Sequence, residues 1–96
     1  MNRPLRAAIL GTGDISASHY KGYLAAGVDV VALCDTAPAA LAARAAAWGV
    51  GRTYTDFQKM FEDGGFELVS IAAPTSVHHP ATLAAAAAGV HVLVET

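Results

Sequence analysis

Two glycines near the start of the chain have the spacing of a turn that can hold phosphate. The segment Gly11-Thr12-Gly13-Asp14-Ile15-Ser16 matches the pattern G-x-G-x-x-small, and it lies between a short apolar run and a stretch of helical composition. In that context the first glycine permits a tight turn, and the second lets the backbone approach a pyrophosphate. The phosphate charge would be met by N–H groups where the following helix begins. We therefore expect Gly11, Thr12, Gly13, Asp14 and Ile15 to contact a dinucleotide.

An acidic residue ends the next apolar run. Asp35 lies 24 residues after Gly11, where a carboxylate can accept hydrogen bonds from an adenosine ribose. A carboxylate there would repel a ribose phosphate, and residues 36–39 carry no cation to bind one, so the pattern favours NAD over NADP. The alternative is that Asp35 only favours the dipole of the next helix, an effect of about 0.3–1 kcal/mol without any ligand.

The remaining residues with reactive side chains have no spacing typical of a site. His78 and His79 are adjacent, so on a regular element they point in different directions and do not share a metal. Cys34 has no second cysteine to pair with, and no cysteine or histidine spacing resembles a zinc site. We expect no metal, and a single unpaired cysteine fits a cytoplasmic protein.

Strand-like and helix-like segments alternate along the chain. We expect strands at 6–10, 28–34, 53–54, 67–73 and from 91 onward. Helices are expected at 14–26, at 38–48 after a Thr36 cap, from a capping box at 55–58 to about 62, and at 80–88 after a loop at 74–76. Nearly unbroken apolar strands between helices predict a doubly wound parallel sheet, the three-layer α/β/α Rossmann class.

Composition limits the partners. The 96 residues are 54% hydrophobic and 15% charged, which favours one compact domain over disorder. The net charge is −2 and the Lys and Arg residues are scattered, so nucleic acid is not expected to bind. Two prolines and three histidines interrupt the charge-free stretch 68–94, which argues against a membrane span. The start of the chain has no secretory signal pattern, so we expect the protein to stay in the cytoplasm.

Five segments in order resemble the amino-terminal part of a known enzyme family, that of glucose-fructose oxidoreductase, inositol dehydrogenase and MocA (Gfo/Idh/MocA). The resemblance extends over essentially the whole chain. It is carried by residues 11–15 with His19, and by residues 31–35, 54–57, 73–78 and 88–95.

The resemblance implies a partial NAD-binding domain, residues 1–96, of an oxidoreductase that acts on sugars, polyols or related secondary alcohols. It further implies that Ala73, Pro74, Thr75 and His78 line the cofactor groove after the fourth strand, and that Glu95 lies near the nicotinamide. In the family a lysine follows that glutamate and moves a proton during hydride transfer. Here Thr96 follows it and does not titrate near neutral pH. We therefore assign no catalytic residue, and we expect the chain, which lacks the family's substrate domain, to be inactive alone.

Two other functions stay open. The chain could be a non-catalytic nucleotide-binding module that kept the groove and lost the lysine, or a structural fragment with no tight ligand. Titration with NAD distinguishes the structural fragment, which would not bind it tightly, from the oxidoreductase part and the nucleotide-binding module. We also expect self-association into a homo-oligomer, because the last strand leaves the sheet incomplete at its C-terminal edge and such apolar edges pair with other chains.

Overall fold

The computed structural model describes residues 3–73 and 75–94. Predictions that fall on Pro74, Glu95 and Thr96 lie outside these residues. No helix in the described part of the chain is long and apolar enough to span a membrane.

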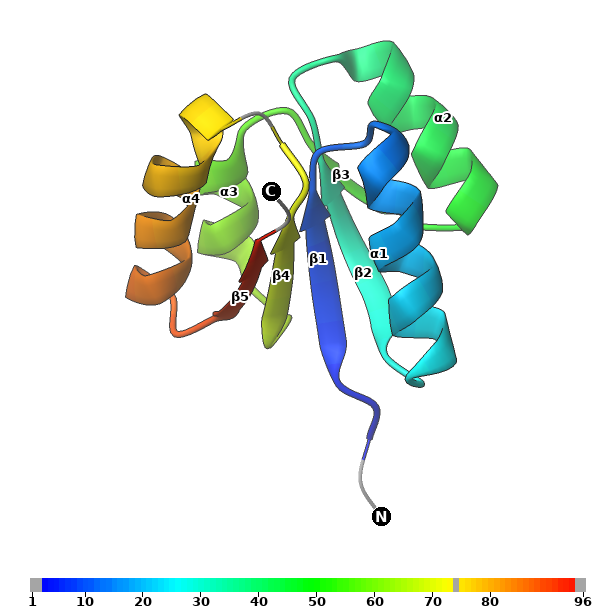
Figure 1. Ribbon diagram of the computed structural model, residues 1–96, viewed down its shortest axis with the longest axis horizontal. Helices are drawn as coiled ribbons and strands as arrows, with labels where there is room; N and C mark the ends of the chain where they lie inside the picture. Colours follow the sequence, from blue (N-terminus) through cyan, green and yellow to red (C-terminus); the bar gives the residue numbers. More distant parts are fainter. Residues whose placement is uncertain (1–2, 74, 95–96) are drawn as a thin grey trace.

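Five parallel strands form one sheet in the order β3-β2-β1-β4-β5 (Figure 1). Their bounds are β1 Arg6–Leu10, β2 Asp29–Cys34, β3 Arg52–Tyr54, β4 Leu68–Ile71 and β5 His91–Val94. The strand order reverses between β1 and β4, and in such sheets ligands bind in the crevice outside the carboxyl ends of the strands at that point. The predicted doubly wound parallel sheet is confirmed.

Four helices cover both faces of the sheet. On one face lie α1 Asp14–Ala25 and α2 Pro38–Trp48, and on the other lie α3 Phe57–Asp63 and α4 Thr75–Ala87 (Figure 1). Side chains of β1 alternate between the two layers. Ala7 and Ile9 pack with the α1 and α2 side, whereas Ala8 and Leu10 pack with the α3 and α4 side. Both faces of β1 are therefore buried, which explains its unbroken apolar sequence.

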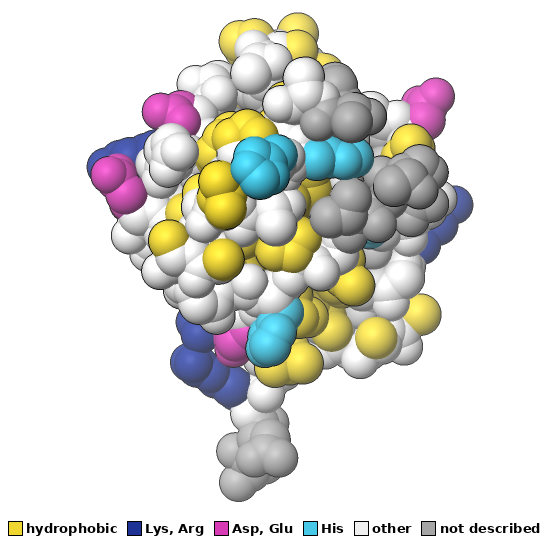
Figure 2. All heavy atoms as spheres, turned by 60° about the vertical axis from the view of Figure 1, so that its left-hand side comes forward, with side chains coloured by type: hydrophobic (Ala, Val, Ile, Leu, Met, Phe, Trp, Pro, Cys, Tyr) yellow, Lys and Arg dark blue, Asp and Glu magenta, His cyan; other side chains and the backbone are white. Residues whose placement is uncertain are grey.

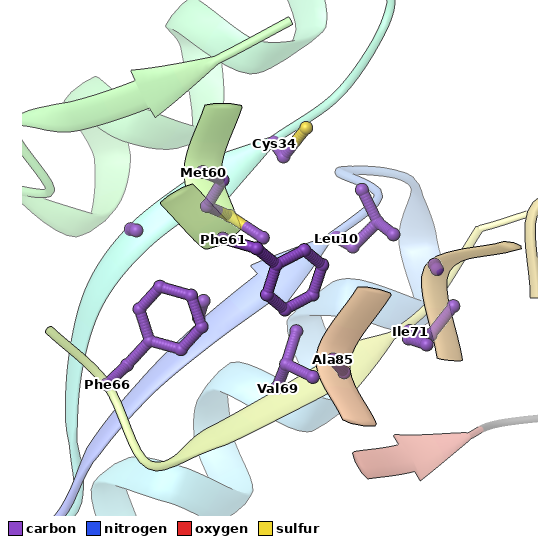
Figure 3. Packing of buried hydrophobic residues seen from close by; sticks show 11 residues of the cluster. Leu10, Cys34, Met60, Phe61, Phe66, Val69, Ile71 and Ala85 are labelled. Carbon is purple, nitrogen blue, oxygen red and sulfur yellow. The ribbon is translucent and has the colours of Figure 1, made fainter. Parts of the chain in front are cut away.

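The larger core cluster lies between the sheet and the helices α3 and α4 (Figure 3). Met60 and Phe61 of α3 are buried there, and the Phe61 ring packs against Phe66 with centroids 5.8 Å apart. Ala81 and Ala85 of α4 are completely buried. Their small side chains let α4 lie close to the sheet. This packing fixes the helices whose first turns flank the carboxyl ends of the strands.

The start of α4 differs from the prediction. We expected a loop at 74–76 and a helix from Pro80, but α4 begins at Thr75 and Pro80 lies inside it. Proline has no N–H, so the carbonyl of Ser76 loses one helical hydrogen bond. The Pro80 side chain is exposed, and the helix continues past it. The preceding strand also ends earlier than expected, at Ile71 instead of Ala73.

Both predicted threonine caps are wrong. The N-cap of α2 is Ala37, which has no side-chain cap, and the Asp35 carboxylate accepts from its N–H at 2.8 Å instead of Thr36 capping the helix. At α3 the N-cap is Asp56, which accepts from the N–H of Gln58 at 2.9 Å. At α3 aspartate therefore replaces threonine as the cap, since aspartate caps a helix at least as well. At α2 the helix has no side-chain cap, and Asp35 binds the N–H of the residue before its first turn.

A buried hydroxyl pair joins α1 to β4 and supports a stability test. The oxygens of Tyr23 and Ser70 lie 2.6 Å apart, and burial raises the pKa of Tyr23 despite that bond. Tyr23→Phe leaves the Ser70 hydroxyl buried without this partner, which costs about 1–3 kcal/mol, and Ser70→Ala acts in the same way on Tyr23. The double variant leaves neither hydroxyl buried without its partner. Its loss of unfolding free energy, measured in urea, is therefore expected to be smaller than the sum of the two single losses. Additive losses would contradict this coupling.

Candidate functional site

Gly11 makes the sharp turn at the carboxyl end of β1. Its φ is +102°, and a Cβ placed on it would lie 2.5 Å from the carbonyl oxygen of Ala72. Any side chain would therefore collide with the backbone that follows β4. The N–H of Gly11 donates to the carbonyl of Cys34 at 2.7 Å, which ties the turn to β2 as well.

Gly13 differs from Gly11, because no protein atom lies within 4 Å of a Cβ added there. It is the exposed N-cap of α1. In the described part of the chain, no carbonyl accepts from the N–H groups of Gly13, Asp14 or Ile15, as is usual where a helix begins. These donors and the positive end of the α1 dipole face open space, an arrangement that suits an anion.

Ser16 occupies the small-residue position of the motif. It is completely buried, and its hydroxyl donates to the carbonyl of Gly13. A residue of this size lets the first turn of α1 lie against the sheet. Serine therefore serves the packing role usually filled by glycine or alanine.

The Asp35 carboxylate holds the turn and the start of α2 together. Its Oδ2 accepts from the N–H and the hydroxyl of Thr12 at 2.8 and 2.7 Å, and its Oδ1 accepts from the N–H of Ala37 at 2.8 Å. Burial alone would raise the pKa of Asp35. Hydrogen bonds from the Thr12 hydroxyl and from the N–H groups of Ala37, Thr12 and Thr36 outweigh that effect and lower the pKa. Asp35 is thus a fixed negative charge.

A pocket of about 240 Å³ opens at the carboxyl ends of the strands. It combines apolar side chains with two carboxylates, and its lining residues are Leu10, Gly11, Cys34, Asp35, Thr36, Thr55, Asp56, Phe57, Ala73 and Val77. Burial raises the pKa of Cys34 to about 12, and the charges of Asp35 and Asp56 act in the same direction. The thiol is therefore neutral at ordinary pH and serves as an apolar wall.

The structure brings only part of the predicted set into this pocket. Gly11, Asp35 and Ala73 line it, and Thr12 is buried beside Asp35. Ile15 lines a second hollow of about 470 Å³ elsewhere on the surface.

The residues after β4 have mixed positions. Thr75 is the first residue of α4, and Pro74 lies outside the described residues, as does Glu95. His78 is half-buried and does not line the pocket. Its Nε2 donates to the carbonyl of Ala73 at 2.6 Å, since a carbonyl can only accept. His78 thereby holds the segment that forms one wall of the pocket.

Two charged residues near the site were missed. Asp56 lines the pocket, and its place two residues after the end of a predicted strand was a signal that could have identified it. Arg44 of α2 donates from Nε to the carbonyl of Thr12 at 3.2 Å. No sequence signal identifies Arg44, because its partners in the turn lie 31 and 32 residues away. Within the described ranges, no group of three or more His, Cys, Asp or Glu side chains could hold a metal.

Comparisons with known proteins point to one enzyme family. A family model described as an oxidoreductase family with an NAD-binding Rossmann fold (GFO_IDH_MocA) matches residues 5–96. D-glucoside 3-dehydrogenase of Escherichia coli is 32% identical over 94 residues, which are 96% of this chain and 27% of that protein. D-apiose dehydrogenase of Rhizobium rhizogenes is 31% identical over 86% of this chain and 24% of its own length. The chain thus spans about a quarter of the length of these relatives.

Solved structures show the same fold. The WlbA dehydrogenase of Chromobacterium violaceum, crystallised with NADH and UDP-GlcNAcA, superposes with a TM-score of 0.91 at 27% identity, over 99% of this chain and 28% of that one. Myo-inositol 2-dehydrogenase of Lactobacillus plantarum gives a TM-score of 0.89 at 33% identity, over 98% and 28% of the two chains.

The low pKa of Asp35 predicts a pH-dependent contribution to stability. Its unfolded pKa is about 3.9. Because the folded pKa is lower, the ionised carboxylate stabilises the fold above that value, and the contribution is lost as pH falls through the folded pKa. We expect the difference in unfolding free energy between wild type and Asp35→Asn to be largest near pH 7 and to shrink below about pH 4. Urea denaturation at a series of pH values measures it.

Glu62→Gln, at an exposed position of α3, is the matched control and should change stability less. A difference for Asp35→Asn that stays constant down to pH 3 would mean that its charge contributes nothing.

Proposed function

Because the chain belongs to the oxidoreductase family with an NAD-binding Rossmann fold, we propose that its pocket and glycine turn bind NAD(H) for a dehydrogenase acting on a sugar, polyol or related secondary alcohol. The observation that carries the proposal is the turn itself. Gly11 brings the backbone against Ala72, while the N–H groups that begin α1 face open space beside the ionised Asp35.

Each part of the cofactor has a matching group in this proposal. The pyrophosphate accepts hydrogen bonds from the N–H groups of Gly13, Asp14 and Ile15. The adenosine ribose donates to Asp35, whose Oδ1 accepts one close hydrogen bond from the protein and whose Oδ2 accepts two. The adenine ring enters the pocket, where neutral apolar side chains such as Val77 can contact its face.

Asp35 also favours NAD over NADP. A 2′-phosphate on the ribose would place a second negative charge beside a carboxylate that hydrogen bonds keep ionised. Asp56 lines the same pocket and adds to this repulsion. Among the described residues, Arg44 is the one cation that contacts the turn. It donates to backbone carbonyls there, so it is not placed to bind a 2′-phosphate.

The reacting end of the site is proposed from the resemblance alone. The nicotinamide of the bound cofactor supplies the hydride chemistry. Pro74, Thr75 and His78 are proposed to line the cofactor groove, with the Ala73 carbonyl held by His78, and Glu95 is proposed to lie near the nicotinamide. Thr96 stands where the family has its lysine, so we propose that this position moves no proton. The sugar and polyol names of the relatives support the substrate class.

Calorimetric titration with NADH tests the proposal directly. We expect a Kd between about micromolar and millimolar, because the chain supplies only part of the surface that holds the cofactor in longer relatives. Gly13→Ala should weaken NADH roughly tenfold, since its Cβ meets no protein atom but occupies the approach of the pyrophosphate.

Gly51→Ala is the control, because a Cβ there also meets no protein atom, in a loop outside the pocket. No binding of NADH at millimolar concentration would favour the structural-fragment alternative, and equal affinities of the two variants would remove the turn from the site.

We also propose that the chain self-associates through β5. Of the described strands, β5 is last in the sheet order and pairs only with β4. Leu93 of β5 is 48% exposed and borders the second hollow together with Ile15, which is equally exposed. Figure 2 shows hydrophobic side chains scattered over the face that carries α4 and β5, with histidines in its upper and lower parts. Such an apolar edge is a template for pairing with another strand.

Leu93→Lys should therefore shift the chain toward monomer in sedimentation at tens of micromolar, because a charge on an edge strand opposes pairing. Leu83→Lys is the control, since Leu83 is 57% exposed but lies on α4. A monomeric wild type, or equal effects of the two substitutions, would contradict pairing through β5.

A further inference from the structure

We infer that Arg44 is a positioning residue for the diphosphate of the cofactor: it holds the carbonyls of the glycine turn so that the turn's N–H groups face the ligand. The inference rests on the proposed function. It goes beyond that proposal by adding a residue outside the motif, on a helix that makes no other hydrogen bond to the turn among the described residues.

The contacts of Arg44 form a fork on the turn. Its Nε donates to the carbonyl of Thr12 at 3.2 Å, and a terminal nitrogen donates to the carbonyl of Gly13 at 3.4 Å. The Gly13 carbonyl also accepts from the N–H and the hydroxyl of Ser16, so Arg44 acts chiefly on the peptide unit of the Thr12 carbonyl. A lysine ammonium presents a single point charge and lacks this planar fork.

The direction of the carbonyls decides the direction of the amides. In a trans peptide unit the C=O and the following N–H point in opposite directions. The unit that contains the Thr12 carbonyl also contains the Gly13 N–H, and the next unit contains the Gly13 carbonyl and the Asp14 N–H. With the Thr12 carbonyl turned to Arg44, the Gly13 N–H points away from it. The Gly13 carbonyl is shared by Arg44 and Ser16, which together set the direction of the Asp14 N–H. These N–H groups are two of the three donors assigned to the pyrophosphate.

The guanidinium is itself held in place. It lies over the ring of Trp48 at 5.2 Å from the centroid, and Trp48 stacks on Tyr20 of α1 with centroids 4.2 Å apart and planes 8° apart. This stack joins the end of α2 to α1, so Arg44 is placed by both helices that follow the glycine turn and Asp35. A residue fixed in this way loses little freedom when it orients a neighbour.

No carboxylate partner explains the position of Arg44. Among the residues that the structure describes, no Asp or Glu lies within salt-bridge distance of it. Within that part of the chain its positive charge is not cancelled by an ion pair, and it lies beside a turn that is proposed to bind two phosphates. The geometry therefore points to orientation of the turn as the role of Arg44.

Titrations of the 96-residue chain with NADH, ADP-ribose and adenosine, followed by NMR, test the inference. In Arg44→Met we expect affinity for NADH and ADP-ribose to fall on the order of tenfold, the range of hydrogen bonds to a charged group, while affinity for adenosine, which has no phosphate, stays within about twofold. The N–H signals of Gly13 and Asp14 should also shift in the free variant, because their peptide units are no longer fixed.

Three variants separate positioning from charge and from stability. Arg44→Lys should behave like Arg44→Met, because the fork is lost although the charge stays. Trp48→Leu, which keeps the arginine but removes the ring beneath it, should give the same ligand pattern to a smaller extent, and it replaces Arg44→Met if that variant does not fold. Lys59→Met removes an exposed charge from α3 and should change no affinity.

The outcomes distinguish the inference from the proposed function. If wild type binds neither NADH nor ADP-ribose, the proposed function fails and the inference fails with it. If wild type binds both and Arg44→Met binds ADP-ribose equally well, only the inference fails. Full recovery by Arg44→Lys would assign the effect to charge, and an equal loss for adenosine would assign it to general stability. Either result overturns a positioning role.

Discussion

One carboxylate organises the end of the sheet where the site lies. Asp35 receives the N–H and hydroxyl of Thr12 from the turn after β1, and the N–H of Ala37 from the start of α2. It thereby joins two segments that leave neighbouring strands in different directions. Because these donors keep it ionised, the same group also sets the sign of the electrostatic field in the pocket. An anion that binds nearby must be held by N–H groups and a helix dipole against that charge.

The two glycines of the turn show how close packing and open space alternate within three residues. At Gly11 a side chain is excluded by the backbone of Ala72, so this glycine is required by the fold. At Gly13 no protein atom lies within 4 Å of an added Cβ, so the fold itself would accept a side chain there. The motif therefore combines one residue needed for structure with one available to a ligand, and Arg44 acts on the peptide units between them.

Features set by local patterns could be predicted from the sequence, and features set by distant contacts could not. The buried strands, the glycine turn and Asp35 follow from apolar runs and short spacings, and the structure contains them where expected. Pro80 made the sequence pattern predict a helix start at residue 80. The helix instead begins at Thr75 and continues through Pro80 to the buried Ala81 and Ala85. The cap at Thr55 was wrong because the neighbouring Asp56 caps α3, and the cap at Thr36 was wrong because the N-cap position of α2 is Ala37.

The position of the site in the sheet also decides which strands support it. Its turn and carboxylate belong to β1 and β2, and Ala72 follows β4, so the supporting strands are central and covered by helices on both faces. The exposed apolar side chains Ile15 and Leu93 lie beside the second hollow, and Leu93 belongs to β5 at the edge of the described sheet. Asp35 and Arg44 both hold Thr12, so the turn is already ordered, and a ligand that bound there would lose little affinity to ordering it. The geometry of the turn can therefore persist whether β5 pairs with another strand or remains exposed, because no hydrogen bond of the turn involves that strand within the described residues.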